Sequence, residues 1–189
     1  MSLMIVGVDE VGRGCIAGPL VVGAVALDKP IEGLRDSKVL TSIKRLALAQ
    51  LIYKEALFFG LGWVSATELD QLGLTKAHTL ASGRALASLE PSKTKCMLDG
   101  NFNYLPKKFH SVELIIHGDA IEPAISAASI IAKVARDNYM INLAKEYPDY
   151  GFNRHVGYGT RAHLEALHKY GVSPYHRKSF EPVKSILKV

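Results

Sequence analysis

Two adjacent acids, Asp9 and Glu10, stand between an apolar run and a glycine-rich turn. The segment 7–14 reads Gly-Val-Asp-Glu-Val-Gly-Arg-Gly. Neighbouring carboxylates repel each other, so they favour a bound cation. The glycines let the backbone approach a ligand closely because they lack a Cβ atom, and Arg13 supplies a planar cation that suits phosphate. The combination predicts a divalent metal that acts on a phosphodiester.

Two further acids, Asp99 and Asp119, each follow a short apolar run. Ligands of open α/β sheets bind outside the carboxyl ends of the strands, so these acids are expected to lie near Asp9. Mg²⁺ prefers oxygen ligands, and two such ions about 3.5–4 Å apart can hold both reacting oxygens of a phosphodiester. The candidate catalytic acids and metal ligands are therefore Asp9, Glu10, Asp99 and Asp119.

Each acid also has an ordinary structural interpretation. Asp99 precedes Gly100, as in many turns, and Asp119 is a residue type favoured at a helix start. Asp137, beside Arg136, is an alternative fourth acid, although a surface ion pair also explains it. Asp9 and Glu10 can serve one site only if the strand ends there, because alternate residues of a strand point to opposite faces.

The hydrophobic pattern predicts a mixed α/β sheet flanked by helices. Residues 3–9 and 20–27 are nearly continuous apolar runs, typical of strands buried on both faces. The glycine-rich turn between them favours an antiparallel hairpin. The other expected elements are strands at 57–64, 95–99 and 112–117, and helices at 43–54, 65–72, 75–86, 122–147 and around 164–167.

Local signals mark where several helices begin. The expected starting residues are Thr41, Ser65 with Glu68 as a capping box, Thr75, and Pro123 in the first turn of the longest helix. The small side chains of 126–129 should let that helix lie close to the sheet. Segment 150–160 is expected to be a glycine-rich loop, and 174–182 a basic irregular segment.

Composition limits the class of protein. The 189 residues fit one domain, and 48% hydrophobic with 22% charged residues is ordinary for a soluble globular chain. A net charge of +5 favours an anionic partner. Cys15 and Cys96 are isolated, as expected of free thiols in a reducing compartment. No membrane-spanning run or leader is recognisable, so we expect a cytoplasmic protein without membrane contact.

Several motifs, in order along the chain, resemble those of the ribonuclease HII family. The first is Asp9-Glu-Val-Gly-Arg-Gly-Cys-Ile-Ala-Gly-Pro19. The others are Asp36-Ser-Lys38, Leu98-Asp-Gly-Asn101, Gly118-Asp119, the segment 125–137, Tyr150-Gly-Phe152, the segment 155–160 and His176-Arg-Lys-Ser-Phe180. The resemblance covers nearly the whole chain.

The resemblance implies an RNase H-like fold, with one catalytic domain over 1–189 and a helical C-terminal portion from about residue 150. It implies hydrolysis of the RNA strand in RNA–DNA hybrids. It also implies nicking on the 5′ side of a single ribonucleotide embedded in duplex DNA, with 3′-hydroxyl and 5′-phosphate products. Two divalent ions, Mg²⁺ or Mn²⁺, are the implied cofactors at the four acids.

Substrate-binding residues are also implied by the resemblance. They are Gly12, Arg13, Gly14, Ser37, Lys38 and Tyr158. The Gly-Arg-Gly turn matches the element that senses the ribose 2′-hydroxyl through its backbone, and Tyr158 matches the tyrosine at the RNA–DNA junction. Val156 replaces the usual lysine of the family, so one basic contact is missing. Ribonuclease HIII, a relative with an extra N-terminal domain, fits less well because the acid pair lies so near the first residue.

Basic residues in the matched segments are expected to contact phosphate and to make binding fall with salt. They are Lys38, Lys133, Arg154, Arg177 and Lys178. His155 and His176 could assist near the scissile phosphate, although a structural role is the simpler interpretation.

Other functions fit parts of the pattern. A junction resolvase on the same fold would share the carboxylates but lack the Gly-Arg-Gly turn and Tyr158. A binding module without catalysis is disfavoured, since carboxylates weaken phosphate binding unless metal intervenes. A nucleotide-binding protein should show a Walker or G-x-G-x-x-G motif after the first strand, and neither is present. We expect a monomer that binds RNA–DNA hybrid and ribonucleotide-containing duplex, with a replication-clamp contact near 185–189 left open.

Overall fold

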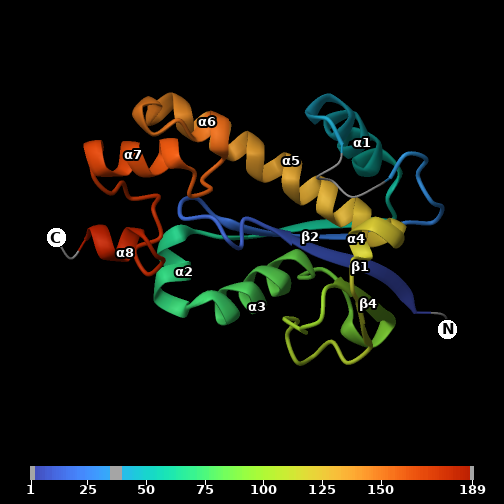
Figure 1. Cartoon of the computed structure of the whole chain (residues 1–189). Coiled ribbons are helices and arrows are strands. Elements are labelled where there is room, and N and C mark those ends of the chain that lie inside the picture. Colours follow the sequence, from blue (N-terminus) through green and yellow to red (C-terminus); the bar gives the residue numbers. More distant parts are fainter. Residues whose placement is uncertain (1–2, 35–39, 188–189) are drawn as a thin grey trace.

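The computed structural model describes residues 3–34 and 40–187, and a five-stranded mixed sheet forms its centre (Figure 1). The strands are β1 (Met4–Val11), β2 (Leu20–Ala26), β3 (Phe58–Val64), β4 (Thr94–Asp99) and β5 (Val112–Ile115). Their order across the sheet is β3-β2-β1-β4-β5. Because β1 pairs antiparallel with β2 and parallel with β4, the predicted hairpin and mixed sheet are confirmed.

Helices cover both faces of this sheet (Figure 1). On one face lie α1 (Ser42–Glu55) and α5 (Pro123–Glu146), and on the other lie α2 (Ala66–Leu72) and α3 (Leu74–Ala85). The short elements are η1 (Pro91–Lys93), α4 (Gly118–Ile121) and η2 (Pro148–Tyr150). The C-terminal portion adds α6 (Phe152–His155), α7 (Arg161–Tyr170) and α8 (Val183–Ile186), so the expected helical extension is present.

Helix α5 lies very close to β1 and β2. A Cβ atom added to Gly7 would clash with the backbone of Ala124, and one added to Gly23 would clash with the carbonyl of Ala128. Small residues on both sides therefore bring helix and sheet into backbone contact. This arrangement confirms the expectation from the small side chains of 126–129.

Most of the predicted helix starts are confirmed. Thr41 caps α1 by accepting the Lys44 N–H, and Ser65 with Glu68 forms a complete capping box on α2. Pro123 occupies the first turn of α5. These signals are local, because each cap is satisfied within three residues of the helix start.

Two local expectations are wrong. Helix α3 begins at Leu74, so Thr75 lies inside it and does not cap it. Gly73 ends α2 and starts α3 with φ of 74°, a conformation that glycine adopts without a Cβ clash. The segment 150–160 is not wholly a loop, since α6 forms one helical turn within it.

Among the residues that the structure describes, three apolar clusters hold the layers together. One joins the sheet to α3, and another joins β2 to α1 and α5. The third, around Met140, Phe152 and Leu167, packs the C-terminal helices against the end of α5. Cys15 and Cys96 are buried free thiols, as expected. Within the described ranges, no helix combines the length and apolar character needed to cross a membrane.

Candidate active site

The parallel ladder between β1 and β4 ends one residue before Asp9 and Asp99. Its last pair joins Val8 to Leu98. Strand β1 remains paired with β2 as far as Val11. Ligands of open α/β sheets bind where neighbouring strands diverge at their carboxyl ends. The topology therefore places Asp9 and Asp99 where β1 and β4 stop pairing with each other.

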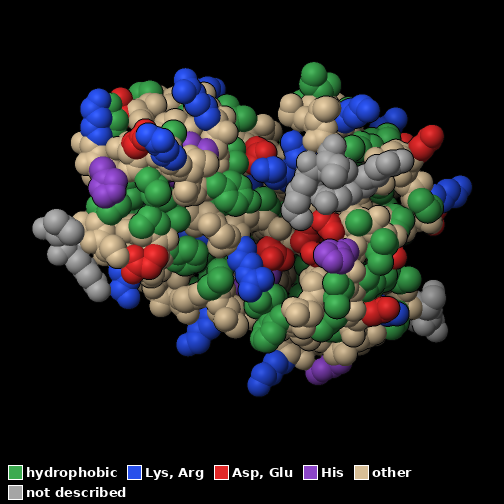
Figure 2. Space-filling view, in the orientation of Figure 1, with side chains coloured by type: hydrophobic (Ala, Val, Ile, Leu, Met, Phe, Trp, Pro, Cys, Tyr) green, Lys and Arg blue, Asp and Glu red, His purple; other side chains and the backbone are tan. Residues whose placement is uncertain are grey.

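A cavity of about 270 Å³ opens at this point. Its lining residues are Asp9, Glu10, Val11, Gly12, Arg13, Gly14, Asp99, Ser129, Lys133 and Tyr158. Figure 2 shows acidic side chains gathered near the middle of one face, where Figure 1 draws β1 and α4. The structure thus brings three of the predicted acids together with the Gly-Arg-Gly turn and the predicted junction tyrosine. We call it the acid-lined cavity.

Strand β1 does not end at Asp9 and Glu10, contrary to the expectation. It continues to Val11 with β2 as its partner. Both acids nevertheless line the cavity. The physical reason is that β4 no longer pairs with β1 beyond Val8. One edge of β1 is therefore unpaired there, and both acid side chains reach the cavity beside it. The Glu10 amide donates a hydrogen bond of 2.7 Å to Asp9 Oδ1.

The Asp99 side chain is tied to the start of α4. Its Oδ1 accepts hydrogen bonds from the Gly118 N–H at 2.7 Å and from the Asp119 N–H at 3.4 Å. Asp119 is buried and adjoins Asp99 through this backbone contact. In the described part of the chain, however, Asp119 is not among the residues that line the acid-lined cavity.

The environment of Asp9 crowds negative charge into a buried position. Burial raises the pKa of Asp9 to about 7, with further increases from Glu10 and Asp99, while a hydrogen bond from Ser129 lowers it. Crowded carboxylates favour either a proton or a cation. The oxygen donors therefore fit a hard divalent cation.

The candidate metal ligands do not form a closed cage in the described part of the chain. Among residues 3–34 and 40–187, no three His, Cys, Asp or Glu side chains are placed so that they could already hold one ion. Asp9, Glu10 and Asp99 still line a single cavity. The chemistry of the donor set fits the expected divalent ion, whereas the closed ligand geometry is absent from the described residues.

Arg13 lies between Glu10 and Tyr104. One guanidinium nitrogen is 3.9 Å from Glu10 Oε1, and the other donates to Tyr104 Oη at 2.8 Å. The Tyr104 ring stacks on His78 with centroids 3.9 Å apart, and His78 Nε2 lies 3.7 Å from Glu10 Oε2. Burial and the nearby Arg13 lower the pKa of His78 to about 4, so its ring is neutral near pH 7.

Tyr104 and His78 are neighbours of the site that the sequence reasoning missed. The one available signal for Tyr104 is an aromatic pair, Phe102 and Tyr104, shortly after Asp99. His78 gives no such signal, because it lies inside α3 among ordinary core residues. His78 reaches Glu10 and Tyr104 because α3 packs against β2 and β3.

Arg136 joins the segment after the Gly-Arg-Gly turn, residues 15–19, to the loop of residues 156–160 that carries Tyr158. Its side chain is fully buried. It donates to the carbonyls of Pro19 at 2.9 Å, Val156 at 2.8 Å and Ala17 at 3.1 Å. Since all three acceptors are backbone oxygens, Arg136 fixes two loops that meet at the acid-lined cavity.

Arg177 does not contact phosphate from the surface, contrary to the prediction. Its side chain is fully buried. It donates to the carbonyls of Gly18 and Arg13, both at 3.0 Å. The Phe180 ring lies 5.2 Å from its guanidinium, and the basic sequence around Arg177 does not reveal this burial. Arg177 therefore braces the Gly-Arg-Gly turn from behind.

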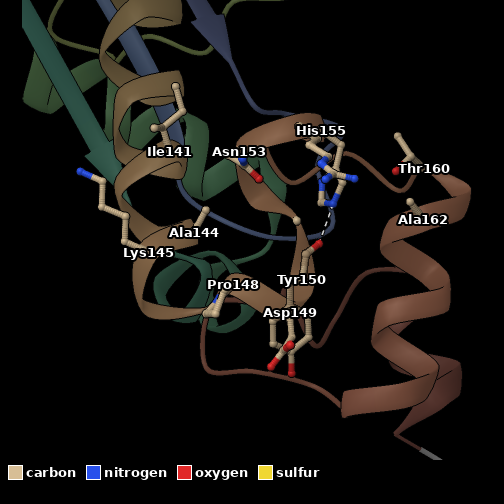
Figure 3. Close-up of a pocket in the computed structure, with 12 residues that line it drawn as sticks. Ile141, Ala144, Lys145, Pro148, Asp149, Tyr150, Asn153, His155, Thr160 and Ala162 are labelled. Carbon is tan, nitrogen blue, oxygen red and sulfur yellow. Dashed lines mark hydrogen bonds between the residues drawn. The ribbon is translucent and has the colours of Figure 1, made fainter.

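The other basic residues are spread over different surfaces. Lys133 lines the acid-lined cavity and pairs with Asp137 at 2.9 Å, so Asp137 forms an ion pair with Lys133 and does not line that cavity within the described residues. Arg154 lines a second cavity of about 740 Å³ (Figure 3). The backbone N–H of Lys178 donates to Asp70. The predicted contacts Ser37 and Lys38 lie outside the described residues.

His155 and His176 are both buried and hydrogen-bonded to other protein groups. Neither lines the acid-lined cavity within the described ranges. The structural interpretation of these two histidines therefore fits better than a direct role beside phosphate.

The mixed sheet with helices on both faces, and the acids at the diverging ends of β1 and β4, define a nuclease of the RNase H-like class. A model of the ribonuclease HII family matches residues 6–183. The chain belongs to the ribonuclease HII family. It is accordingly a type II ribonuclease H, an endonuclease that hydrolyses RNA in RNA–DNA hybrids.

Individual relatives align with this chain over nearly their whole length. The chain is 47% identical over 191 residues to the ribonuclease HII of Polynucleobacter asymbioticus, covering 98% of this chain and 96% of the relative. The crystal structure of ribonuclease H2 from Pyrococcus horikoshii OT3 superposes with a TM-score of 0.81 at 29% identity, covering 98% of both chains. The structure of the PCNA:RNase HII complex from Archaeoglobus fulgidus superposes with a TM-score of 0.78 at 26% identity, covering 95% of this chain and 96% of that chain.

Proposed function

We propose that this ribonuclease also nicks duplex DNA on the 5′ side of a single embedded ribonucleotide, leaving 3′-hydroxyl and 5′-phosphate ends. We further propose that it does so with two divalent ions, Mg²⁺ or Mn²⁺. The observation that carries the proposal is the lining of one cavity. Asp9, Glu10 and Asp99 face the same space of about 270 Å³ as the Gly-Arg-Gly turn and Tyr158.

The acids are the proposed metal ligands. Asp9, Glu10 and Asp99 would hold the ions, with Asp119 as the fourth acid because its N–H shares the Oδ1 of Asp99. When bound, such ions lower the pKa of water and stabilise charge on the phosphodiester oxygens. The Ser129 hydrogen bond to Asp9 favours the carboxylate form that a cation requires.

The Gly-Arg-Gly turn is the proposed reader of the ribose 2′-hydroxyl, the group that distinguishes RNA from DNA. Gly12 has φ of 86°, in the left-handed region that favours glycine. A Cβ atom on Gly14 would meet no heavy atom within 4 Å, so the backbone there faces open space beside the acids. A sugar can therefore approach the backbone of this turn closely.

Tyr158 is the proposed stacking residue at the RNA–DNA junction. Its side chain is 42% exposed and lines the acid-lined cavity. An exposed aromatic ring beside such a site can stack on a sugar or base. Lys133 and Arg13 line the same cavity and are the proposed phosphate contacts there.

A sliding clamp is a candidate partner. The relative from Archaeoglobus fulgidus was solved as a complex with PCNA. In this chain the candidate segment is 185–189, of which 188–189 lie outside the described residues. We expect the enzyme itself to act as a monomer.

A cleavage assay on matched substrates tests the proposed function. The substrates are an RNA–DNA hybrid, a DNA duplex with one ribonucleotide, the same duplex without it, and a four-way DNA junction. We expect cleavage of the first two only, only with Mg²⁺ or Mn²⁺, and with 3′-hydroxyl ends on the nicked product. Cleavage of the junction, or of the hybrid without metal, would contradict the proposal.

A further inference from the structure

The backbone of Tyr158 is held on both sides by histidines. Its N–H donates to the carbonyl of His155 at 2.9 Å. Its carbonyl lies 2.8 Å from His163 Nδ1 and also accepts the Thr160 N–H at 2.8 Å. The residue with the exposed ring is therefore fixed through its main chain.

The hydrogen bonds determine which nitrogen of each ring carries the proton. The Tyr158 carbonyl can only accept, so His163 Nδ1 must donate to it. In a neutral His163, Nε2 is then an acceptor, and His176 Nε2, at 3.0 Å, must donate to it. His176 Nδ1 is left to accept from the Ser173 N–H at 3.0 Å and from the Ser173 hydroxyl at 2.8 Å. Every ring nitrogen of this histidine chain has one consistent role.

The histidine chain is neutral and shielded from water. His163 is 0% exposed and His176 is 1% exposed. Burial lowers the pKa of both rings to about 4. A proton added to His163 Nε2 would face the N–H of His176 and break their hydrogen bond. The hydrogen-bonded histidine chain of Ser173, His176 and His163 therefore keeps one arrangement of protons near neutral pH.

His155 fixes the other end of the same loop. Its Nε2 donates to the Tyr150 carbonyl at 2.8 Å, the bond dashed in Figure 3, and its Nδ1 accepts the Gly157 N–H at 3.3 Å. The Gly157 carbonyl in turn accepts the Ile16 N–H at 3.0 Å. The loop is thus joined to the segment that follows the Gly-Arg-Gly turn. His155 also lines the second cavity of about 740 Å³. Within the described residues, His163 and His176 do not line it.

The loop does not adopt this path by itself. Val156 has φ of 43°, in the left-handed region that is costly for a β-branched residue. Such a conformation persists only where its surroundings impose it. The bonds from His155, His163 and Arg136 to residues 156–158 supply that constraint.

We propose that His163 and His176 are positioning residues for ribonucleotide recognition. The chain from Ser173 through both rings fixes the Tyr158 carbonyl, and thereby keeps the Tyr158 ring at the acid-lined cavity. The inference rests on the proposed role of Tyr158 at the RNA–DNA junction. It assigns to two buried histidines an effect on which substrate is cleaved, in addition to their packing.

Two substitutions at one position separate positioning from packing. In His163→Asn, the amide N–H can take the place of Nδ1–H and donate to the Tyr158 carbonyl, whereas His163→Leu has no donor. One net hydrogen bond corresponds to at most about tenfold in a rate ratio. We expect His163→Leu to lower cleavage at a single ribonucleotide up to roughly tenfold more than cleavage of a long hybrid, and His163→Asn to restore most of that difference.

The Tyr158→Ala background provides the control. There, His163→Leu should no longer change the ratio of the two activities, because the ring that it positions is gone. Melting curves for each variant show whether the fold is retained. Equal losses on both substrates, or an undiminished effect in the Tyr158→Ala background, would overturn the inference.

Nitrogen-15 NMR of the imidazole rings tests the histidine chain without any activity. We expect neutral His163 protonated on Nδ1 and neutral His176 protonated on Nε2 at pH 7. His163 protonated on Nε2 would overturn the inference even if the variants lose activity. An unaltered enzyme that fails to cleave at single ribonucleotides, with both tautomers as expected, would instead contradict the proposed function.

Discussion

The Asp99 carboxylate accepts a hydrogen bond of 2.7 Å from the backbone N–H of Gly118. The bond joins the end of β4 to the start of α4, and it brings the Asp119 N–H to 3.4 Å from the same oxygen. Asp99 thus has two functions in the structure. It lines the acid-lined cavity, and it anchors the helix that carries the fourth candidate acid.

This relationship predicts unequal effects of two substitutions. Asp119→Asn should lower the rate of hybrid cleavage by roughly 10–100-fold, because Asp119 is the one proposed metal ligand that, within the described residues, does not line the acid-lined cavity. Asp99→Asn should cost more, because it removes a carboxylate from the cavity lining and weakens the acceptor for Gly118. The measurement is kcat at saturating Mg²⁺ for both variants. A larger loss in Asp119→Asn would reverse the assigned roles.

The buried Arg136 predicts a large effect on stability. Arg136→Met would leave the carbonyls of Pro19, Ala17 and Val156 without their donor. Each buried carbonyl left without a donor costs about 1–3 kcal/mol, so the loss for the three together should be at least about 3 kcal/mol. Urea unfolding of the variant should show a decrease of that size in the free energy of unfolding.

Arg161→Met is the matched control for Arg136→Met. Arg161 pairs with Glu165 on α7, with side chains 93% and 63% exposed. Exposed pairs of this kind contribute at most about 1 kcal/mol. A loss at Arg136 no larger than the loss at Arg161 would show that the two loops are held by other contacts.

The buried histidines predict a loss of stability in acid. The pKa of His163 and His176 is about 4 in the folded chain and 6.5 as the ordinary value. Between these values the unfolded chain binds protons that the folded chain cannot, so this contribution to stability is complete above pH 6.5 and falls as the pH drops toward 4. Each pKa unit corresponds to about 1.4 kcal/mol, so each ring contributes a few kcal/mol.

Urea unfolding at pH 7 and pH 5 measures this effect. His163→Asn removes one of the two titrating rings, and the free energy of unfolding should then change less between these pH values than in the unaltered protein. Comparison of the two proteins cancels the carboxyl groups that titrate in both. An unchanged difference between pH 7 and pH 5 would show that His163 is not buried in its neutral form.

Local patterns were sufficient for most of the fold. Continuous apolar runs located β1 and β2, and the signals at Thr41, Ser65 and Pro123 fixed helix starts, because strand burial and capping depend on nearby residues. The prediction that Thr75 caps a helix was wrong because Gly73, with its positive φ, ends α2 and begins α3.

Long-range packing explains what the sequence did not reveal. Arg177 stands in a basic segment, yet it is buried against backbone carbonyls of residues more than a hundred positions earlier. Tyr104 contacts Arg13 across 91 positions. The acids at 9, 10 and 99 could be grouped because they follow the apolar runs of β1 and β4, and these two strands pair in parallel. The roles of all four acids stay predictions until they are tested in solution.

Cleavage of an RNA–DNA hybrid by Asp9→Asn, measured over a range of Mg²⁺ concentrations, tests the role of the acid-lined cavity most directly. If Asp9 holds the divalent ions, the variant should lose about 4 kcal/mol of transition-state stabilisation, or roughly 10³-fold in rate. It should still bind the hybrid, and Asp149→Asn, in a different cavity, should retain full activity. Cleavage by Asp9→Asn within a few-fold of the unaltered protein would contradict the account.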